Sequence, residues 1–239
     1  PQLAGPKAAR VYREMAENDP TIGAILFALN NLMRGAPWSV QPANDSDEAR
    51  AEADFVDSLM HDMSYSWTDV LGEIATMFVF GYAPLEIVYK VRRGPREADP
   101  RYRSRHTDWR IGLRKLALRM QTSIYRWEFD DDGSVLGVHQ FAVTGHSAFI
   151  PIEKLLLFRT TVVGNNPEGR SLLRSAYRPW FFKKRFEEIE AIGVERDAAG
   201  MPVLRVPGEI MDPNAPDDKR RLYESLKQLV TQVRRDQKE

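Results

Sequence analysis

The spacing of apolar residues predicts helices along the first part of the chain. Ile22, Leu26, Leu29 and Met33 recur at the interval of one helical face. Asp19-Pro20-Thr21 precedes them and is typical of a helix start, with proline at the first helical position. We therefore expect helical structure within residues 7–34, with a shorter helix carrying Val11 and Met15 before this start.

Two more helices are expected before residue 81. The stretch "NDSDEARAEADFVDSLM" offers Asp45 or Ser46 as an N-cap and places acids in the first turn, where the helix dipole favours them. Ser66 opens the next helix, because Ser66 and Asp69 have the spacing of a capping box with Asp in place of Glu. Gly81 is expected to end that helix.

Strand patterns dominate the middle of the chain. "PWSVQP" and "APLEIVYKV" predict strands, and "RWEFDDDGSVLGVHQF" predicts a hairpin because Asp132-Gly133 lies between aromatic and β-branched residues. "AFIPIEKLLLFRT" adds one or two strands, whereas Pro95 to Asp108 lacks periodicity and is expected to be a long loop. Helices, then strands, then helices indicate an α+β fold.

The C-terminal part returns to helical patterns. Ser171 is a good N-cap for a short helix to Arg178, and Pro179 is expected to kink or break it before a long helix resumes. In that helix the apolar positions 182, 186, 189 and 192 form a stripe one residue wide, expected to bury one side only. A connector from Gly200 to Pro216 leads to a last helix at Asp217 to Glu239.

Charge is unevenly distributed along a chain of zero formal net charge. Lys90 to Arg119 contains eleven Lys and Arg residues against three acidic residues. Such a basic segment suits phosphate, and the residues for that contact are Arg92, Arg93, Arg101, Arg103 and Arg105. A solvated arginine loop or an inter-subunit salt-bridge region explains the same composition, so these alternatives stay open.

Candidate catalytic and metal motifs are incomplete. Gly145-His146-Ser147-Ala148-Phe149 lacks the final glycine of a nucleophile elbow, and a strand pattern follows it where the elbow needs a helix. "DDDG" at 130–133 has His139 where a calcium loop needs Glu, and "GNNPEG" lacks the Lys-Ser/Thr of a P-loop. The chain has no cysteine, and its four histidines lack zinc-ligand spacing. We expect no enzyme activity, no metal and no cofactor.

The ends and the hydropathy add two expectations. No apolar run approaches the roughly 20 residues of a membrane span, and no signal peptide is visible. The chain begins at Pro1 and stops mid-pattern at "RRDQKE", so we expect it to be trimmed at both ends.

Four stretches, in order, resemble the portal proteins of tailed double-stranded DNA phages, in particular the Mu-like branch and its siphophage and prophage relatives. The core stretch is "NNPEGRSLLRSAYRPWFFKKRFEEIEAIGVERDAAGMPV". The others are "MAENDPTIGAILFALNNLMRGAPWSVQP", "WTDVLGEIATMFVFGYAPLEIVYK" and "IPIEKLLLFRT". Together they cover most of residues 10–207.

This resemblance implies a portal fold with a helical stem and mixed wing and clip strands. It assigns residues 1–139 to the wing, 140–170 to clip-like strands and a polar turn, 171–198 to the stem helix, and 199–239 to a connector with a wing- or crown-proximal helix. Gly200–Pro216 would correspond to the tunnel loop. Because family members continue past Glu239, the crown part would lie outside this chain.

The resemblance also implies a function. Portals are not enzymes; they form rings, usually of twelve subunits, at one capsid vertex of the virion, and assemble in the host cytoplasm. DNA is packaged and ejected through the channel, and terminase, head-tail adaptor and major capsid proteins are partners. The rival interpretation is a non-enzymatic nucleic-acid-binding or scaffold protein that uses residues 90–119.

The charge order of the long helix fits a ring. Lys183, Lys184 and Arg185 precede Glu187, Glu188 and Glu190, an order that opposes the helix dipole. We expect these six residues to face the channel or to pair between neighbouring subunits, because a uniformly basic channel would grip DNA. Pro179 and Gly169 are expected to form the structural joint at the start of this helix.

Overall fold

The computed structural model describes residues 3, 5–141, 145–199, 203–212 and 214–232. The chain divides into two units, Pro1–Arg178 and Pro179–Glu239. The boundary expected at 139/140 falls inside a strand, and the one expected at 170/171 precedes the unit boundary by a few residues.

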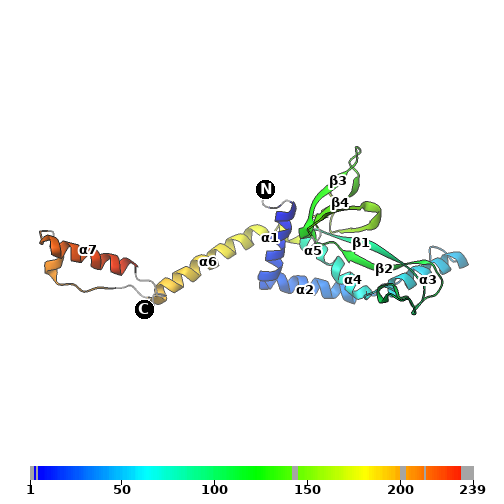
Figure 1. The fold of residues 1–239 in the computed structure, drawn as a ribbon, viewed down its shortest axis with the longest axis horizontal. Coiled ribbons are helices and arrows are strands. Elements are labelled where there is room, and N and C mark those ends of the chain that lie inside the picture. Colours follow the sequence, from blue (N-terminus) through cyan, green and yellow to red (C-terminus); the bar gives the residue numbers. More distant parts are fainter. Residues whose placement is uncertain (1–2, 4, 142–144, 200–202, 213, 233–239) are drawn as a thin grey trace. The chain divides into compact units, whose positions relative to one another are not determined.

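Unit 1 contains five helices and six strands within the described residues (Figure 1). The helices are α1 (Gly5–Asn18), α2 (Pro20–Gly35), α3 (Asp47–His61), α4 (Trp67–Ile74) and α5 (Thr76–Phe80). The strands are β1 (Tyr82–Val91), β2 (Ile111–Leu118), β3 (Ile124–Phe129), β4 (Val135–Phe141), β5 (Ser147–Pro151) and β6 (Leu155–Arg159). The α+β class expected from the sequence is confirmed.

The helix starts follow the local chemistry of the sequence. Asp19 accepts hydrogen bonds from the backbone N–H groups of Thr21 and Ile22, so it caps α2 with Pro20 in the first turn. Ser66 and Asp69 form the expected capping box at α4. The helix expected to run to Gly81 is divided at Ala75 into α4 and α5, and Gly81 then ends α5 with a φ of 96°.

Two antiparallel sheets of three strands organise unit 1. Their strand orders are β2-β1-β6 and β3-β4-β5. The predicted hairpin is the β3–β4 pair, and "AFIPIEKLLLFRT" supplies β5 and β6, one to each sheet. The described part of the clip-like segment 140–170 is therefore paired into both sheets of unit 1.

Two apolar clusters form the core of unit 1. Val70, Leu71 and Ile74 of α4 pack with Ala83, Leu85 and Leu116 of the first sheet. A second cluster joins the two sheets and consists of Tyr82, Ile124, Val138, Ile150 and Leu155. These buried side chains supply the stabilisation that unit 1 gains from removing apolar surface from water.

One strand prediction is wrong. "PWSVQP", residues 37–42, is described by the structure and forms no strand. Pro37 and Pro42 cannot donate to a β-ladder, which limits pairing on both sides of the segment. Trp38 instead packs edge-on against Trp67, with 6.0 Å between ring centroids.

Unit 2 is helical in the residues that the structure describes. It contains most of α6 (Tyr177–Ala199) and all of α7 (Asp217–Gln232). The expected short helix before Pro179 is a 3-10 turn, Leu172–Arg174, and α6 begins at Tyr177, so Pro179 lies in its first turn. The last helix is described to Gln232, and its expected continuation to Glu239 lies outside the described residues.

Candidate subunit-contact and nucleic-acid surfaces

The arginine-rich segment is anchored by a buried ion pair. The Lys90 ammonium lies 3.0 Å from Asp62 Oδ2, and the two side chains are 2% and 3% exposed. Lys90 also donates to the backbone oxygen of Arg103 at 2.8 Å. Asp62 accepts from the Ser104 hydroxyl at 2.6 Å and from the Arg105 backbone N–H at 2.8 Å. The C-terminal end of α3 thus fixes the middle of the loop.

The environment of Asp62 favours its charged form. Burial alone would raise its pKa, but the hydrogen bonds from Ser104 and Arg105, with the Lys90 ammonium, lower it below the ordinary value. An unpaired charge at this depth would be strongly destabilising. The pair therefore holds the loop between β1 and β2 in one conformation.

Arg92 is a correction to the expected phosphate-binding set. The whole residue is 2% exposed. Its guanidinium pairs with Asp108 at 3.2 Å, donates to the Ser58 hydroxyl at 2.9 Å and lies over the Phe55 ring. Because it is packed between Gly112 of β2 and α3, Arg92 stabilises unit 1 and has no surface with which to meet phosphate.

The other four arginines of that set are exposed on the loop, and three have partners inside it. Arg93 lies 3.5 Å from Glu97, and Arg103 donates from Nε to the Glu97 backbone oxygen at 3.1 Å. Arg101 approaches Asp99 at 2.6 Å and, through that hydrogen bond, lowers the pKa of Asp99 to about 2. Arg105 uses its backbone N–H to bind Asp62. The loop is consequently a folded, partly neutralised structure.

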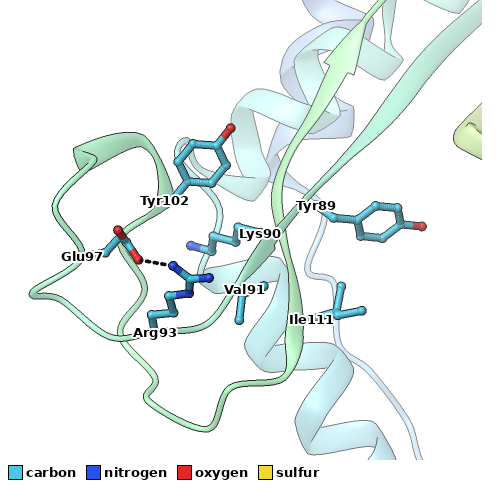
Figure 2. A pocket seen from close by; sticks show the side chains of 7 residues that line it. All are labelled: Tyr89, Lys90, Val91, Arg93, Glu97, Tyr102 and Ile111. Carbon is cyan, nitrogen blue, oxygen red and sulfur yellow. Dashed lines mark hydrogen bonds and ion pairs between the residues drawn. The ribbon is translucent and has the colours of Figure 1, made fainter.

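A cavity of about 450 Å³ opens beside this loop. Figure 2 shows Tyr89 and Ile111 on one side and Arg93, Glu97 and Tyr102 on the other, with Val91 and Lys90 between them. Trp109 is 68% exposed, has a φ of 59° and lies under the Arg93 guanidinium. The site therefore combines an apolar floor with a basic, aromatic margin.

The charges of α6 are exposed and partly paired within the helix. Lys183 lies 3.8 Å from Glu187, and Arg185 lies 3.0 Å from Glu188. The Lys184 ammonium lies 5.7 Å from the centroid of the Trp180 ring. Exposed ion pairs of this kind contribute about 0–1 kcal/mol each. Glu190 is exposed as well.

The apolar stripe of α6 is exposed along the described part of the helix. Phe182 is 46% exposed, Phe186 66%, Ile189 65% and Ile192 57%. The sequence predicts that the side of the helix carrying these apolar residues is buried, whereas all four are exposed. The residues of unit 2 that the structure describes leave this stripe exposed.

Gly169 belongs to a close backbone contact. It has a φ of 59°, and a Cβ placed on it would lie 2.5 Å from the Gly81 backbone oxygen. Thr160 bonds both Gly81 and Arg170, so the polar turn is fixed onto the start of β1. Pro179 lies in the first turn of α6. The joint expected from Gly169 and Pro179 together stays a prediction.

Sequence reasoning did not find the Lys90–Asp62 pair, the cavity or β2. The available signal was the alternation in "YKVR", where apolar Tyr89 and Val91 alternate with Lys90 and Arg92. That alternation shows two faces but does not say that the basic face is the buried one.

No membrane-crossing helix occurs in the described part of the chain, since none is long and apolar enough. Among the same residues, no group of three or more His, Asp or Glu side chains is placed to hold a metal ion.

Two comparisons agree with this fold. The family model described as the portal protein of Mu bacteriophage matches residues 9–236. A solved chain from the neck of an empty GTA particle, computed with C6 symmetry, is similar with a TM-score of 0.51 and 12% sequence identity. The alignment covers 91% of this chain and 55% of that one, so this chain spans about half of the length of its structural neighbour. Because the family model spans nearly all of its residues, the chain belongs to the family of the portal protein of Mu bacteriophage.

Proposed function

We propose that the protein is a portal subunit, copies of which form a ring at one capsid vertex through which viral DNA is packaged and ejected. The match of the portal family to residues 9–236 carries this proposal. The likeness to a neck component of a symmetric particle supports the fold that it requires. In this role the protein is a structural component of the virion with no catalytic activity of its own, and it is built into the capsid vertex in the host cytoplasm.

The exposed surface of α6 supports assembly with other copies. Phe186 and Ile189 are about two-thirds exposed on a helix of 23 residues, and apolar side chains in a row favour burial against a partner. Side-to-side contacts between identical subunits are heterologous and close into a ring when the rotation closes. Twelve copies is the number expected for a portal.

Partners follow from the same role. Double-stranded DNA would occupy the channel, terminase and head-tail adaptor proteins would dock on the ring, and the major capsid protein would surround it. The mixed charges of α6 suit a channel that lets DNA slide. A uniformly basic surface would neutralise many phosphates, and each of these contacts adds salt-dependent affinity that would hold the DNA in place.

Electron microscopy of the negatively stained protein, combined with native mass spectrometry, tests the proposal. We expect rings whose mass is a whole multiple of 27.4 kDa. A protein that stays monomeric or dimeric at all concentrations, and binds duplex DNA through residues 90–119, would instead support the scaffold or nucleic-acid-binding function.

The α6 charges have a separate test within this proposal. Lys184→Glu with Arg185→Glu should impair ring assembly if these residues pair with Glu187, Glu188 or Glu190 of a neighbour. Lys7→Glu with Arg10→Glu on α1 is the matched control, since both residues are exposed and the charge change is identical. Intact rings in the α6 variant would show that these residues do not contribute to the subunit interface.

A further inference from the structure

The far ends of β1 and β2 form a ribbon with two different faces. Lys90 and Arg92 reach α3, where Lys90 pairs with Asp62 and Arg92 bonds Ser58. Side chains alternate along a strand, so Tyr89 and Val91 point to the opposite side. They are exposed there and line the 450 Å³ cavity with Ile111. One face of the ribbon is therefore covered by α3, and the other is open.

The outer side of α3 is acidic. Residues 45–57 contain six acids and a single base, Arg50. Glu48, Glu52 and Val56 are exposed at successive intervals of four residues, so they share one stripe of the helix, and Val56 is 44% exposed. Within the part of the chain that the structure describes, neither Glu48 nor Glu52 makes an ion pair.

The margin of the cavity has the opposite charge. Arg93 lines it, Arg96 precedes the lining residue Glu97, and Arg101 and Arg103 flank the lining residue Tyr102. The side chains of Arg96 and Arg105 are exposed and form no ion pair with any residue that the structure describes. The floor of Val91 and Ile111 suits an apolar side chain better than a phosphate.

The two charged surfaces are not brought together within one chain. The loop is fixed at Asp62, just after the C-terminal end of α3. Glu48 lies 14 residues earlier, about 21 Å along the helix. The cavity lies on the face of the ribbon away from α3. Complementary surfaces on opposite sides of a subunit are suited to a head-to-tail contact.

We propose that the acidic stripe Glu48–Glu52–Val56 of one subunit docks on the arginine-lined cavity of the next. Val56 would meet the apolar floor, and the two glutamates would meet the exposed arginines of the loop. This interface rests on the proposed ring, and its occupant is a second copy of the chain. It also accounts for a chain whose net charge is zero although its basic and acidic residues are segregated.

Charge reversal on either side tests the contact. Glu48→Lys with Glu52→Lys reverses the stripe, and Arg96→Glu with Arg105→Glu reverses the loop. Each variant alone should lower the ring population at least about tenfold at the concentration where the wild type is half assembled, because like charges then face each other. Thermal unfolding of the loop variant should stay close to wild type, because neither Arg96 nor Arg105 is buried or ion-paired among the described residues. The stripe variant should be slightly less stable, because Glu48 lies in the first turn of α3, where the helix dipole favours an acid.

Mixing the two variants gives the sharper result. In an alternating ring every stripe again faces a loop of opposite charge, so a 1:1 mixture should recover rings to within about threefold of the wild type. Native mass spectrometry should find both variants in equal numbers, and such alternation requires an even number of subunits.

Four outcomes would overturn the proposal. Rings at wild-type levels in both separate variants would show that the surfaces do not meet. Loss of rings in both variants without recovery on mixing would show that they do not pair with each other. Normal rings in the loop variant, with loss of salt-dependent binding to a 30-base-pair duplex, would assign the loop to DNA. A wild-type protein that forms no rings would contradict the proposed portal function, and the proposed interface would fall with it.

Discussion

Apolar side chains are buried in unit 1 but exposed on helix α6. In unit 1, Leu85 and Val70 are completely buried, and even Lys90 and Arg92 are enclosed. On the described part of α6, Ile189 and Phe186 remain about two-thirds exposed. Unit 1 gains its stability from contacts within the chain. The apolar side chains of α6 are left exposed by the described residues of unit 2.

The largest effect is expected from breaking the buried pair of unit 1. Asp62→Asn leaves the Lys90 ammonium buried without its counter-charge and should reduce the free energy of unfolding by about 3–5 kcal/mol. Urea denaturation at pH 7 measures this. Asp57→Asn, an exposed position on the same helix, is the control and should change it by less than about 0.5 kcal/mol.

The same pair sets a pH dependence. Because the folded-state pKa of Asp62 is lowered, its contribution is present above the pKa of an unfolded Asp and is lost as pH falls through the folded-state value. Wild type should lose stability below about pH 4 more steeply than Asp62→Asn. Parallel curves for the two proteins would contradict a charged Asp62 in the folded state.

A smaller loss is expected from the backbone contact at Gly169. Ala at this position keeps a φ of 59° only with strain of about 1–2 kcal/mol, and its Cβ would meet the Gly81 oxygen at 2.5 Å. Thermal unfolding should therefore shift down for Gly169→Ala. Gly193→Ala on α6 is the control, because a Cβ there meets nothing within 4 Å and alanine favours helix, so its stability should be unchanged or slightly higher.

The smallest effect on unfolding is expected on the exposed stripe of α6. Phe186→Ser with Ile189→Ser should change the free energy of unfolding of the isolated chain by no more than about 0.5 kcal/mol per site, because little packing is lost. Ring formation by light scattering should nevertheless fall. A large loss of stability in the monomer would show that the stripe is covered within the chain and would remove the contrast with unit 1.

The sequence predicts local structure well where local chemistry decides it. The caps at Asp19 and Ser66, the hairpin turn at Asp132-Gly133 and the αL end at Gly81 all depend on residues within a few positions of each other. β2 was missed because its partner β1 is separated from it by a long loop. The strand expected at "PWSVQP" does not form, because a strand needs a neighbouring strand to pair with and its own backbone N–H groups to donate. A local sequence pattern does not show whether a neighbour exists, and the two prolines lack an N–H.

The candidate sites were harder to predict because burial is a tertiary property. Five arginines of similar appearance were grouped by composition, yet Arg92 is enclosed beneath Gly112 and Phe55 while Arg105 remains exposed. A buried lysine such as Lys90 is rare enough that sequence alone favours the surface. The order of charges on α6 was visible in the sequence, but the proposed pairing between subunits concerns contacts that a single chain does not contain.

The contact between the polar turn and the start of β1 also has a consequence for biosynthesis. Ser171 donates to the Val79 backbone oxygen from 92 residues farther along the chain. At a synthesis rate of about 5–20 residues per second, that interval takes roughly 5–18 s on the ribosome. Once β2 has been made, β1 has a partner on one edge, while its other edge waits for β6, Leu155–Arg159. A nascent chain therefore carries an open strand edge until β6 arrives, and a translational pause before residue 155 would prolong its exposure to neighbouring chains on the same messenger RNA.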